Sequence, residues 1–389
     1  MKVLVANLGS TSFKFRLFDM TTEQELARGA ADRLGAATGT AVFHYGSTRH
    51  VAVAPLADHA AAMEYFLTQL MTAGLTAQAL GFKAVHARGL TGSVRVTPDV
   101  LAAIEAYEAV APGHNPPYLH AMRSTLERWP TLPLVAVFET GFHSTIPRAQ
   151  RSYAVPESWE QAGVRRWGFH GASHRWIAER TAILLRRGDL KIISCHLGGS
   201  SSLCAIASGR SVATSMGMSP QSGLPQNNRV GDFDIFAVPV LLNELNLTLP
   251  EVLATLSTQS GLLGMAGSND LEEILQQAEK GDLRAAHAVD VYVAAIRHYL
   301  GAYLVVLGGA DVIVFTGGIG ERSPYIRQRV CADLEWFGIK LDSVRNEAGA
   351  AERPLHDVVS RVQIWTMPTN EELIVARETW AVLQREGQA

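Results

Sequence analysis

Cysteine and clustered positive charge are both scarce in this sequence. Its 389 residues include three cysteines, Cys195, Cys204 and Cys331, and no two of them have CxxC spacing. Three thiols cannot all pair, and isolated cysteines do not make a zinc-binding pattern, so we expect a reducing compartment and no zinc site. The formal net charge is −3, and no stretch is rich in Lys and Arg. Nucleic acid is therefore not expected as a partner, because binding to its backbone needs a concentrated basic face.

The sequence also lacks an uninterrupted hydrophobic run of membrane-spanning length. The longest apolar segment, residues 285–308, is broken by His287, Asp290, Arg297 and His298, which favours a buried helix over a membrane span. At the N-terminus no basic segment precedes a hydrophobic one, since the chain leads directly into an apolar run. We therefore expect a cytoplasmic protein with no membrane partner.

The order of strands, glycine turns and helices predicts an α/β protein. A chain of 389 residues exceeds one ordinary core and indicates two domains. Alternating polar and apolar residues predict strand, turn and strand over residues 2–19, with Ser12 and Lys14 on the face opposite the phenylalanines. Further strands are expected at 79–85, 133–138, 191–195 and 311–315, and helices at 57–73, 99–107 and 115–128.

Capping residues mark three helix ends. Ser173 is expected to cap a helix whose end is signalled by Gly188. A second helix is expected to begin after Ser323, with a proline in its first turn. Thr369 and Glu372 match a capping box, which predicts the start of the last helix.

Two glycine-containing turns repeat one arrangement. NLGSTSFKF, residues 7–15, and HLGGSSSLCAI, residues 196–206, each follow an apolar run and place a polar residue, Leu and Gly before small hydroxyl residues. Glycines let backbone N–H groups approach a phosphate, and hydroxyls or a lysine complete the contacts. Neither turn has the GKS/T of a P-loop, and either one alone is compatible with an ordinary β-hairpin. Their duplication favours phosphate binding, and a third glycine run at 317–320 favours a nucleotide contact near a helix N-terminus.

Several polar residues are candidates for phosphoryl chemistry. His170 and His174 are four residues apart, but no third ligand is close in sequence, so we interpret His170 as an ordered loop residue rather than half of a metal pair. Arg229 is either a solubilising residue or the fixed planar cation that a phosphoryl group requires. Glu139 ends a strand, and Glu371 offers a hard oxygen ligand for magnesium.

Taken in order, these segments resemble the acetate kinase (acetokinase) family along nearly the whole chain. The resemblance rests on the two phosphate turns and on FTGGIGE, APGHNP, WGFHGASHR, TSMGMSP, NNRVGDFD, SGLLGMAGSND and PTNEE. It implies an actin-like ATPase (ribonuclease H-like) fold with duplicated βββαβαβα domains and the active site in the cleft between them. The expected domains are 1–143 with 372–389, and 144–371. The family also implies a homodimer.

The resemblance further implies a reversible in-line phosphoryl transfer, in which ATP and acetate or propionate give ADP and an acyl phosphate. Mg²⁺, with Mn²⁺ as an alternative, would be held by Asn7 and Glu371. The catalytic residues would be Glu139, His170 and Arg229. Those expected to bind the carboxylic acid are Lys83, Val85, Gly113, His114, Phe169 and Pro220. Those expected to bind ATP and its phosphates are Ser10, Ser12, Lys14, His196, Leu197, Gly198, Gly199, Ser200, Asp270, Leu271, Glu272, Gly318, Ile319, Gly320, Glu321 and Arg322.

Four single residues, and the stretch 223–228 ahead of Arg229, depart from the family pattern. Lys83 replaces the arginine expected to bind the substrate carboxylate, and it offers a point charge instead of a bidentate fork. Arg88 is an alternative partner for the carboxylate. Gly113 replaces a leucine and should enlarge the acyl pocket, while Glu139 replaces an aspartate and Glu272 an arginine. We therefore keep two alternatives, a kinase for a longer or bulkier acid such as butyrate and a non-catalytic nucleotide-binding regulator.

Overall fold

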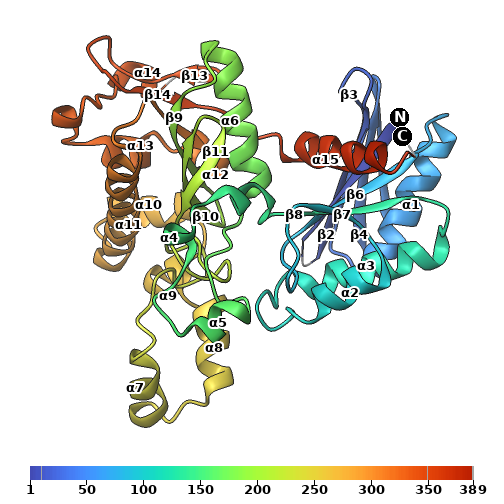
Figure 1. Cartoon of the computed structure of the whole chain (residues 1–389), viewed down its shortest axis with the longest axis horizontal. Helices are drawn as coiled ribbons and strands as arrows, with labels where there is room; N and C mark the ends of the chain where they lie inside the picture. The colour runs from blue at the N-terminus through green and yellow to red at the C-terminus, as the bar shows by residue number, and fades with distance from the viewer. Residues whose placement is uncertain (10, 348, 388–389) are drawn as a thin grey trace. The chain divides into compact units, whose positions relative to one another are not determined.

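The chain folds into two compact units, as the computed structural model shows (Figure 1). The structure describes residues 1–9, 11–347 and 349–387, so Ser10, an expected phosphate-binding residue, lies outside the described residues. One unit comprises Met1–Ser144 and Asn370–Ala389, and the other comprises Thr145–Thr369. The last helix therefore belongs to the same unit as the first strand.

An eight-stranded sheet forms the centre of the first unit, in the order β5-β4-β3-β2-β1-β6-β8-β7. The pairs β1–β6 and β6–β8 are parallel, and the other pairs are antiparallel. The strands are β1 (Lys2–Leu8), β2 (Ser12–Asp19), β3 (Gln24–Asp32), β4 (Gly39–Tyr45), β5 (Thr48–Ala54), β6 (Ala79–Ala84), β7 (Ser93–Arg95) and β8 (Leu134–Phe138).

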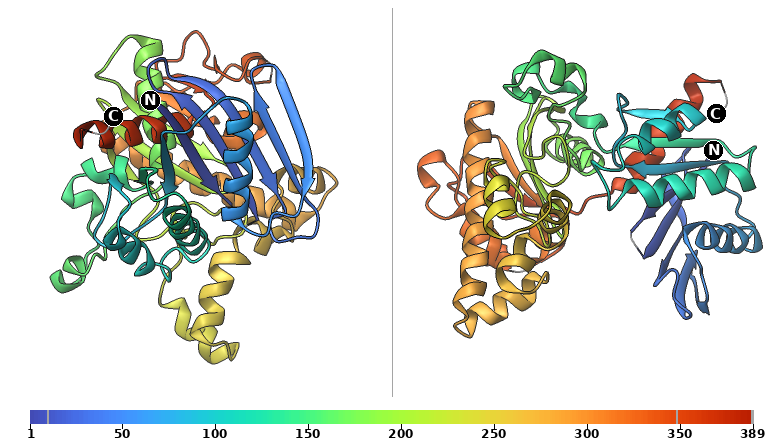
Figure 2. Two further views of the ribbon diagram at one scale, coloured as in Figure 1. Left: turned by 90° about the vertical axis from the view of Figure 1, so that its right-hand side faces the viewer. Right: turned by 90° about the horizontal axis from the view of Figure 1, so that it is seen from below.

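Helices cover both faces of this sheet. The face that carries Phe13 and Phe15 packs in one core with α1 (His59–Thr72), α2 (Pro98–Glu105) and α3 (Asn115–Arg128), and Figure 2 shows α1 along the sheet. The opposite face receives α15 (Glu371–Arg385), which contacts β1, β6 and β8. A short helical turn, η1 (Gly141–Thr145), follows β8. As predicted, Lys14 is exposed while its phenylalanine neighbours are buried.

The last helix is capped differently from the sequence prediction. Asn370 is the N-cap, and its side chain accepts a hydrogen bond from the backbone N–H three residues later. Glu372 instead forms an ion pair with Arg16 at 4.0 Å, so the predicted capping box of Thr369 and Glu372 is wrong. Asparagine caps helices at least as well as threonine. Its use as the cap makes Glu371 the first residue of the helix.

A six-stranded sheet forms the centre of the second unit, in the order β11-β10-β9-β12-β14-β13. The pairs β9–β12 and β12–β14 are parallel, and the remaining pairs are antiparallel. The strands are β9 (Lys191–Leu197), β10 (Ser201–Ala207), β11 (Arg210–Thr214), β12 (Val312–Thr316), β13 (Arg353–Pro354) and β14 (Gln363–Thr366).

Five neighbouring strands of the first sheet correspond, in chain order and in direction, to five neighbouring strands of the second. The first sheet contains β3-β2-β1-β6-β8 and the second contains β11-β10-β9-β12-β14. In each series three antiparallel strands are followed along the chain by two parallel ones, which are reached through helices. The predicted α/β architecture with two related halves is confirmed.

The second unit also contains one long central helix, α11 (Leu283–Leu307). By length and composition this helix could cross a membrane. However, Ala288, Tyr292, Ile296 and Leu300 lie in the core that it shares with β9, β10 and β12, so we interpret it as a core helix. The other helices are α4 (Arg148–Arg151), α5 (Glu157–Gln161), α6 (Gly171–Leu185), α7 (Ala237–Glu244), α8 (Leu249–Thr258), α9 (Gly261–Ala266), α10 (Leu271–Glu279), α12 (Gly317–Arg322), α13 (Pro324–Cys331), η2 (Glu335–Phe337) and α14 (Ser343–Glu347).

Helix α6 begins earlier than predicted. Its N-cap is His170, in the left-handed conformation with φ of 57°, and its C-cap is Arg186. Ser173 lies in the first turn, where its hydroxyl hydrogen-bonds to His196 at 2.8 Å. The predictions of Ser173 as the N-cap and of Gly188 as the end signal are therefore wrong.

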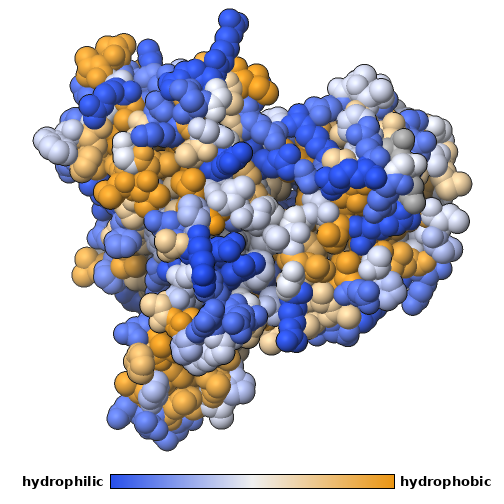
Figure 3. Space-filling view, in the orientation of Figure 1, coloured by the Kyte–Doolittle hydropathy of each residue, from blue (hydrophilic) through white to orange (hydrophobic). Residues whose placement is uncertain are grey.

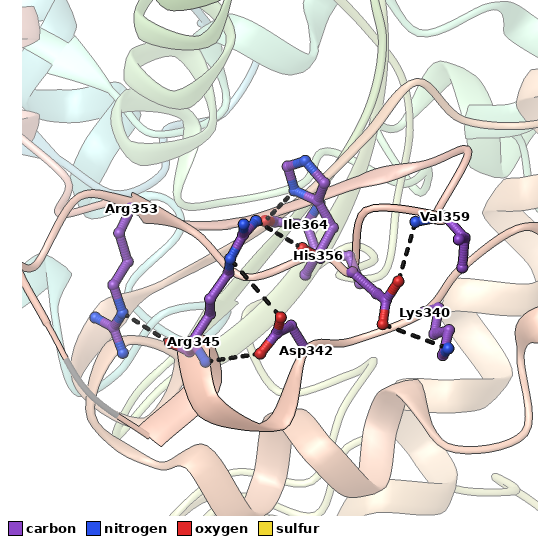
Figure 4. A network of polar contacts seen from close by, with 8 residues as sticks. Lys340, Asp342, Arg345, Arg353, His356, Val359 and Ile364 are labelled. Carbon is purple, nitrogen blue, oxygen red and sulfur yellow. Dashed lines mark hydrogen bonds and ion pairs between the residues drawn. The ribbon is translucent and has the colours of Figure 1, made fainter.

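A network of polar contacts connects residues 340–345 with the segment after α14 (Figure 4). Lys340 pairs with Asp357 at 3.3 Å, and Arg345 pairs with Asp342 at 3.8 Å. Arg345 also donates a hydrogen bond to the carbonyl oxygen of His356 at 3.0 Å. Each pair, half-buried or exposed, contributes little by itself, but together they hold residues 340–345 against the segment after α14, which follows one wall of the site described below.

Candidate active site

In the first unit, charged side chains gather where the parallel strands end. Lys83 lies near the end of β6, opposite Val137 of β8. Glu139 directly follows β8, and its N–H donates to the carbonyl oxygen of Ala84 at 2.9 Å. Glu371 reaches the same edge from the start of α15. The carboxyl ends of parallel strands are the usual position of ligand sites in α/β proteins.

Lys83 and Glu371 form an ion pair at this edge, with side chains 18% and 11% exposed. Burial by itself lowers the pKa of Lys83, but the carboxylates of Glu371 and Glu139 outweigh burial and raise it above its ordinary value. Burial also raises the pKa of Tyr118 to about 12, and its hydroxyl accepts a hydrogen bond from the N–H of Leu8 at 3.1 Å. Lys83 therefore neutralises part of the negative charge of Glu371 and Glu139. A substrate carboxylate that contacted Lys83 would have to share the ammonium group with Glu371.

The first phosphate turn joins β1 to β2. Asn7 pairs with Lys14 across the hairpin, and the N–H of Gly9 donates to the carbonyl oxygen of Ser12 at 2.9 Å. The Nε2 of His59, in α1, hydrogen-bonds with the carbonyl oxygen of Gly9 at 2.8 Å. This histidine was missed by sequence reasoning, because nothing near it in the chain indicates a contact with the turn.

The residues expected to bind the acid are distributed over both units. In the first unit Val85 is half-buried after β6, and His114 is the N-cap of α3. Gly113 is exposed in the turn before α3, and a Cβ at this position would meet no atom within 4 Å. Phe169 and Pro220 are buried in the second unit. The turn that contains Gly113 therefore has room for a larger side chain.

Asn115 holds this turn in place and was not predicted. It is 1% exposed, and its Nδ2 donates to the carbonyl oxygens of His86, Ile104 and Tyr107 at 3.0, 3.0 and 3.2 Å. It thereby connects the turn to α2 and to the segment after β6. The sequence signal that could have indicated this role is an asparagine followed by two prolines at the start of a helix.

In the second unit, the second phosphate turn opens onto a cavity of about 670 Å³. A volume of this size suits a nucleoside. The cavity brings together eight of the predicted nucleotide-binding residues, Gly198, Gly199, Asp270, Leu271, Glu272, Gly318, Ile319 and Arg322. Lining residues that sequence reasoning missed are Asn227, Asn269, Leu275, Ser323, Pro324, Tyr325, Gln328 and Glu347.

Other predicted nucleotide-binding residues lie outside the described cavity lining: His196, Leu197, Ser200, Gly320 and Glu321. The carboxylate of Glu321 accepts a hydrogen bond from the N–H of Gly317 at 3.0 Å, and burial raises the pKa of this carboxyl group. Gly317 has a φ of 78°, and a Cβ there would lie 2.6 Å from the carbonyl oxygen of Leu197. Only glycine permits this approach without strain, so Gly317 allows α12 to pack against β9.

Arg327 connects the glycine-rich helix α12 to α14. It is 1% exposed and donates to the carbonyl oxygens of Gly320 and Glu321 at 2.9 and 2.8 Å. It also donates to the side-chain and backbone oxygens of Asn346 at 2.8 and 2.7 Å, next to Glu347 of the cavity wall. Burial lowers the pKa of Arg327 to about 10, so it remains charged at neutral pH. No sequence motif indicates this residue.

Arg229 is fixed beside the second phosphate turn. Its Nη1 donates to Gln226 Oε1 at 3.1 Å and to Ser200 Oγ at 3.3 Å. Gly261, with a φ of 61°, packs closely against the same loop. A Cβ at Gly261 would lie 2.6 Å from the carbonyl oxygen of Arg229. Burial lowers the pKa of Arg229, but a guanidinium keeps its charge in proteins. The loop therefore presents a rigid cation of the type that binds phosphoryl groups.

His170 also lies beside this turn. Its Nδ1 is 2.8 Å from Ser202 Oγ in β10, and its ring stacks on His196 with the centroids 4.3 Å apart. The rings of His170 and His174 are 6.4 Å apart. Among the described residues, no group of three or more His, Cys, Asp or Glu side chains is arranged to hold a metal ion.

The end of the parallel strands in the first unit has the donor chemistry of a magnesium site. Glu139 and Glu371 are buried carboxylates, and Asn7 adds an amide oxygen at the end of β1. Hard oxygen atoms are the ligands that Mg²⁺ prefers. Two buried carboxylates and one amide therefore offer hard oxygen atoms at the same strand edge, so these residues fit the ion.

Comparison with known proteins identifies the family of this chain. The model of the Acetokinase family matches residues 2–377. An acetate kinase from Dictyoglomus thermophilum is 41% identical over 400 aligned positions, which cover 99% of this chain and 100% of that protein. An acetate kinase from Clostridium novyi is 37% identical, and the alignment covers 100% of both chains.

Solved structures agree with this assignment. A propionate kinase from Francisella tularensis superposes with a TM-score of 0.91 at 33% identity, covering 98% of this chain and 99% of the other. An acetate kinase from Porphyromonas gingivalis superposes with a TM-score of 0.87 at 34% identity and the same coverage. These similarities confirm the predicted duplicated actin-like ATPase fold. This chain belongs to the acetokinase family of kinases.

Proposed function

We propose that this protein transfers the γ-phosphoryl group of ATP to the carboxylate of a short-chain acid, acetate or propionate. The reaction is reversible, gives ADP and an acyl phosphate by direct in-line transfer, and takes place in the cytoplasm. The observation that carries the proposal is the cavity of about 670 Å³ at the second phosphate turn, together with Arg229, whose guanidinium is fixed beside the same turn. Full-length similarity to acetate and propionate kinases supports the same conclusion.

In the first unit we assign metal binding to Asn7 and Glu371, with Mg²⁺ as the ion and Mn²⁺ as the alternative. Such an ion supplies neutralisation of phosphate charge. Lys83 holds the carboxylate of Glu371 in position through its ion pair. We propose a catalytic role for Glu139, which is buried at the same strand edge.

In the second unit we assign charge stabilisation to Arg229 and His170. Phosphoryl transfer needs little covalent chemistry from the protein and depends on donors around the transferred group. The Arg229 guanidinium is held by two hydrogen bonds, and His170 is held by a hydrogen bond and a ring stack. The backbone at Gly198 and Gly199 is the proposed contact for the ATP phosphates.

The proposal is tested by trapping the product with hydroxylamine. Purified protein with ATP, Mg²⁺ and each acid from acetate to butyrate should form the corresponding acyl hydroxamate. Replacing ATP with pyrophosphate should abolish the product, because the cavity is of nucleoside size. ATP binding without hydroxamate from any acid would contradict the proposal and favour the non-catalytic nucleotide-binding regulator.

Gly113 is expected to broaden the range of acids. The Gly113→Leu variant should lower kcat/KM for butyrate roughly tenfold relative to acetate, because one methylene is worth about 1 to 3 kcal/mol of discrimination. The new side chain meets no atom within 4 Å at its Cβ, so the fold should tolerate it. The ratio of kcat/KM values for butyrate and acetate measures the effect.

Gly188 provides the matched control for this substitution. It is also a glycine at which a Cβ would meet no atom within 4 Å, and it lies after α6 in the other unit. Gly188→Leu should leave the butyrate-to-acetate ratio unchanged. An unchanged ratio in Gly113→Leu as well would remove Gly113 from the acyl site.

We also propose a homodimer formed through α7 and α8. Phe236, Val240, Leu245 and Leu253 are exposed by 82, 56, 61 and 53% and contribute to a hydrophobic area over these helices (Figure 3). Exposed apolar patches of this kind mark protein contact surfaces. The double variant Phe236→Asp and Val240→Asp should be monomeric by light scattering after gel filtration.

Val305 in α11 provides the control for this prediction, because it is equally exposed, at 82%. Val305→Asp should remain dimeric. A monomeric wild-type protein, or a double variant that stays dimeric, would show that α7 and α8 are not the interface.

A further inference from the structure

Three buried side chains form a line of hydrogen bonds behind His170. Ser202 Oγ lies 2.8 Å from His170 Nδ1 and 2.9 Å from His174 Nε2. The other ring nitrogen of His174, Nδ1, lies 2.8 Å from Ser194 Oγ. His174, Ser194 and Ser202 are all fully buried. The line therefore runs from Ser194 through His174 and Ser202 to His170.

The protons available to this line permit only two arrangements. A neutral imidazole donates from one nitrogen and accepts at the other, and a serine hydroxyl has one proton to donate. Burial disfavours the charged form of His174. Ser202 could accept from both histidines, but its own buried proton would then have no acceptor among the described residues, which is unfavourable. Ser202 therefore donates to one histidine and accepts from the other, so all the bonds point either toward His170 or away from it.

Ser194 decides between the two directions. In the described part of the chain, His174 Nδ1 is the hydrogen-bond partner of the Ser194 hydroxyl. When Ser194 donates to Nδ1, each proton in the line has an acceptor. In the opposite arrangement the Ser194 proton is buried with no acceptor, which is unfavourable. Ser194 therefore donates to His174, His174 donates to Ser202, and Ser202 donates to Nδ1 of His170.

We propose that Ser202 and His174 are positioning residues that select the tautomer of His170 with its proton on Nε2. The inference rests on the proposed function, in which His170 donates a hydrogen bond to the transferred phosphoryl group. A neutral His170 that accepts at Nδ1 is ready to donate from Nε2 without first binding another proton. The stack on His196 holds the ring plane, and the hydrogen bond from Ser202 holds the tautomer.

Nitrogen NMR of the histidine rings tests the tautomer without using activity. In the uniformly ¹⁵N-labelled full chain, the His170 signals are assigned by their loss in His170→Gln. The expected spectrum near pH 8 shows an unprotonated Nδ1 and a protonated Nε2 for His170. A protonated Nδ1, with or without a proton on Nε2, would overturn the inference.

Variants of Ser202 test its positioning role. Ser202→Ala should populate both tautomers of His170 and lower kcat about tenfold, with KM for ATP and the acid within about twofold of wild type. Ser202→Thr keeps the hydroxyl and should restore the single tautomer. Ser173→Ala removes a similar hydrogen bond from His196 and should leave the His170 tautomer unchanged.

These measurements separate the inference from the proposed function. A wild-type protein that shows the Nε2 tautomer but forms no acyl hydroxamate would contradict the function and support the hydrogen-bond line. Full activity in Ser202→Ala together with mixed tautomers would overturn the positioning role. A single, unchanged tautomer in Ser202→Ala would overturn the role of Ser202 in selecting it.

Discussion

Replacing Arg229 with alanine is expected to lower kcat for acyl phosphate formation about 1,000-fold. The guanidinium is held by Gln226 and Ser200 beside the second phosphate turn, so it meets the developing charge without reorganisation. ATP binding should change little, because Arg229 is not among the residues that line the nucleotide cavity in the described part of the chain. The hydroxamate assay gives kcat, and calorimetry gives the ATP affinity.

Two further arginine variants control this experiment. Arg229→Lys keeps the charge but not the planar fork, so it should recover only part of the lost rate. Arg210→Ala removes an exposed arginine at the start of β11 and should leave kcat unchanged. A kcat within about tenfold of wild type in Arg229→Ala would show that this residue does not stabilise the transition state.

Arg327→Ala is expected to destabilise the second unit by about 3 to 5 kcal/mol. The substitution removes the donor to two carbonyl oxygens of α12 and to the side-chain oxygen of Asn346, and buried acceptors without donors are costly. The melting temperature should fall by about 10 °C. ATP should also bind more weakly, because α12 and the end of α14 both line the cavity.

Arg345 provides the matched control for Arg327, because it lies in the adjoining network of Figure 4 but is exposed to solvent. Its ion pair with Asp342, at 3.8 Å, should be worth at most about 1 kcal/mol. Arg345→Ala should therefore melt within a few degrees of wild type. Equal melting temperatures for the two alanine variants would contradict the structural role of Arg327.

The elements that sequence reasoning predicted correctly are those with a local signal. The alternation that predicted strands over residues 2–19 corresponds to β1 and β2, which pair in the expected hairpin. Ser323 caps α13 with Pro324 in its first turn, as predicted. In these cases hydrophobic period and capping chemistry act within a few residues, so no distant contact is needed to select the structure.

The wrong predictions concern neighbouring residues that compete for one role. Thr369 and Asn370 can both cap a helix, and the structure uses Asn370. Ser173 has the chemistry of an N-cap, but its hydroxyl binds His196 in another element, and the N-cap of α6 is His170 instead. Local preference differs little between such alternatives, so tertiary contacts decide between them.

The sequence by itself determined the family, the duplicated α/β architecture and the two glycine turns, because these depend on ordered motifs and short-range patterns. The tertiary structure decided how the side chains are used. Lys83 and Glu371 are 288 residues apart in the chain but form an ion pair where the parallel strands end, and no local pattern indicates it. The buried contacts of Arg327 and the hydrogen-bond line behind His170 likewise join separate strands and helices. The direction of each hydrogen bond depends on burial and on which donors and acceptors lie within reach, and both are set only once the chain has folded.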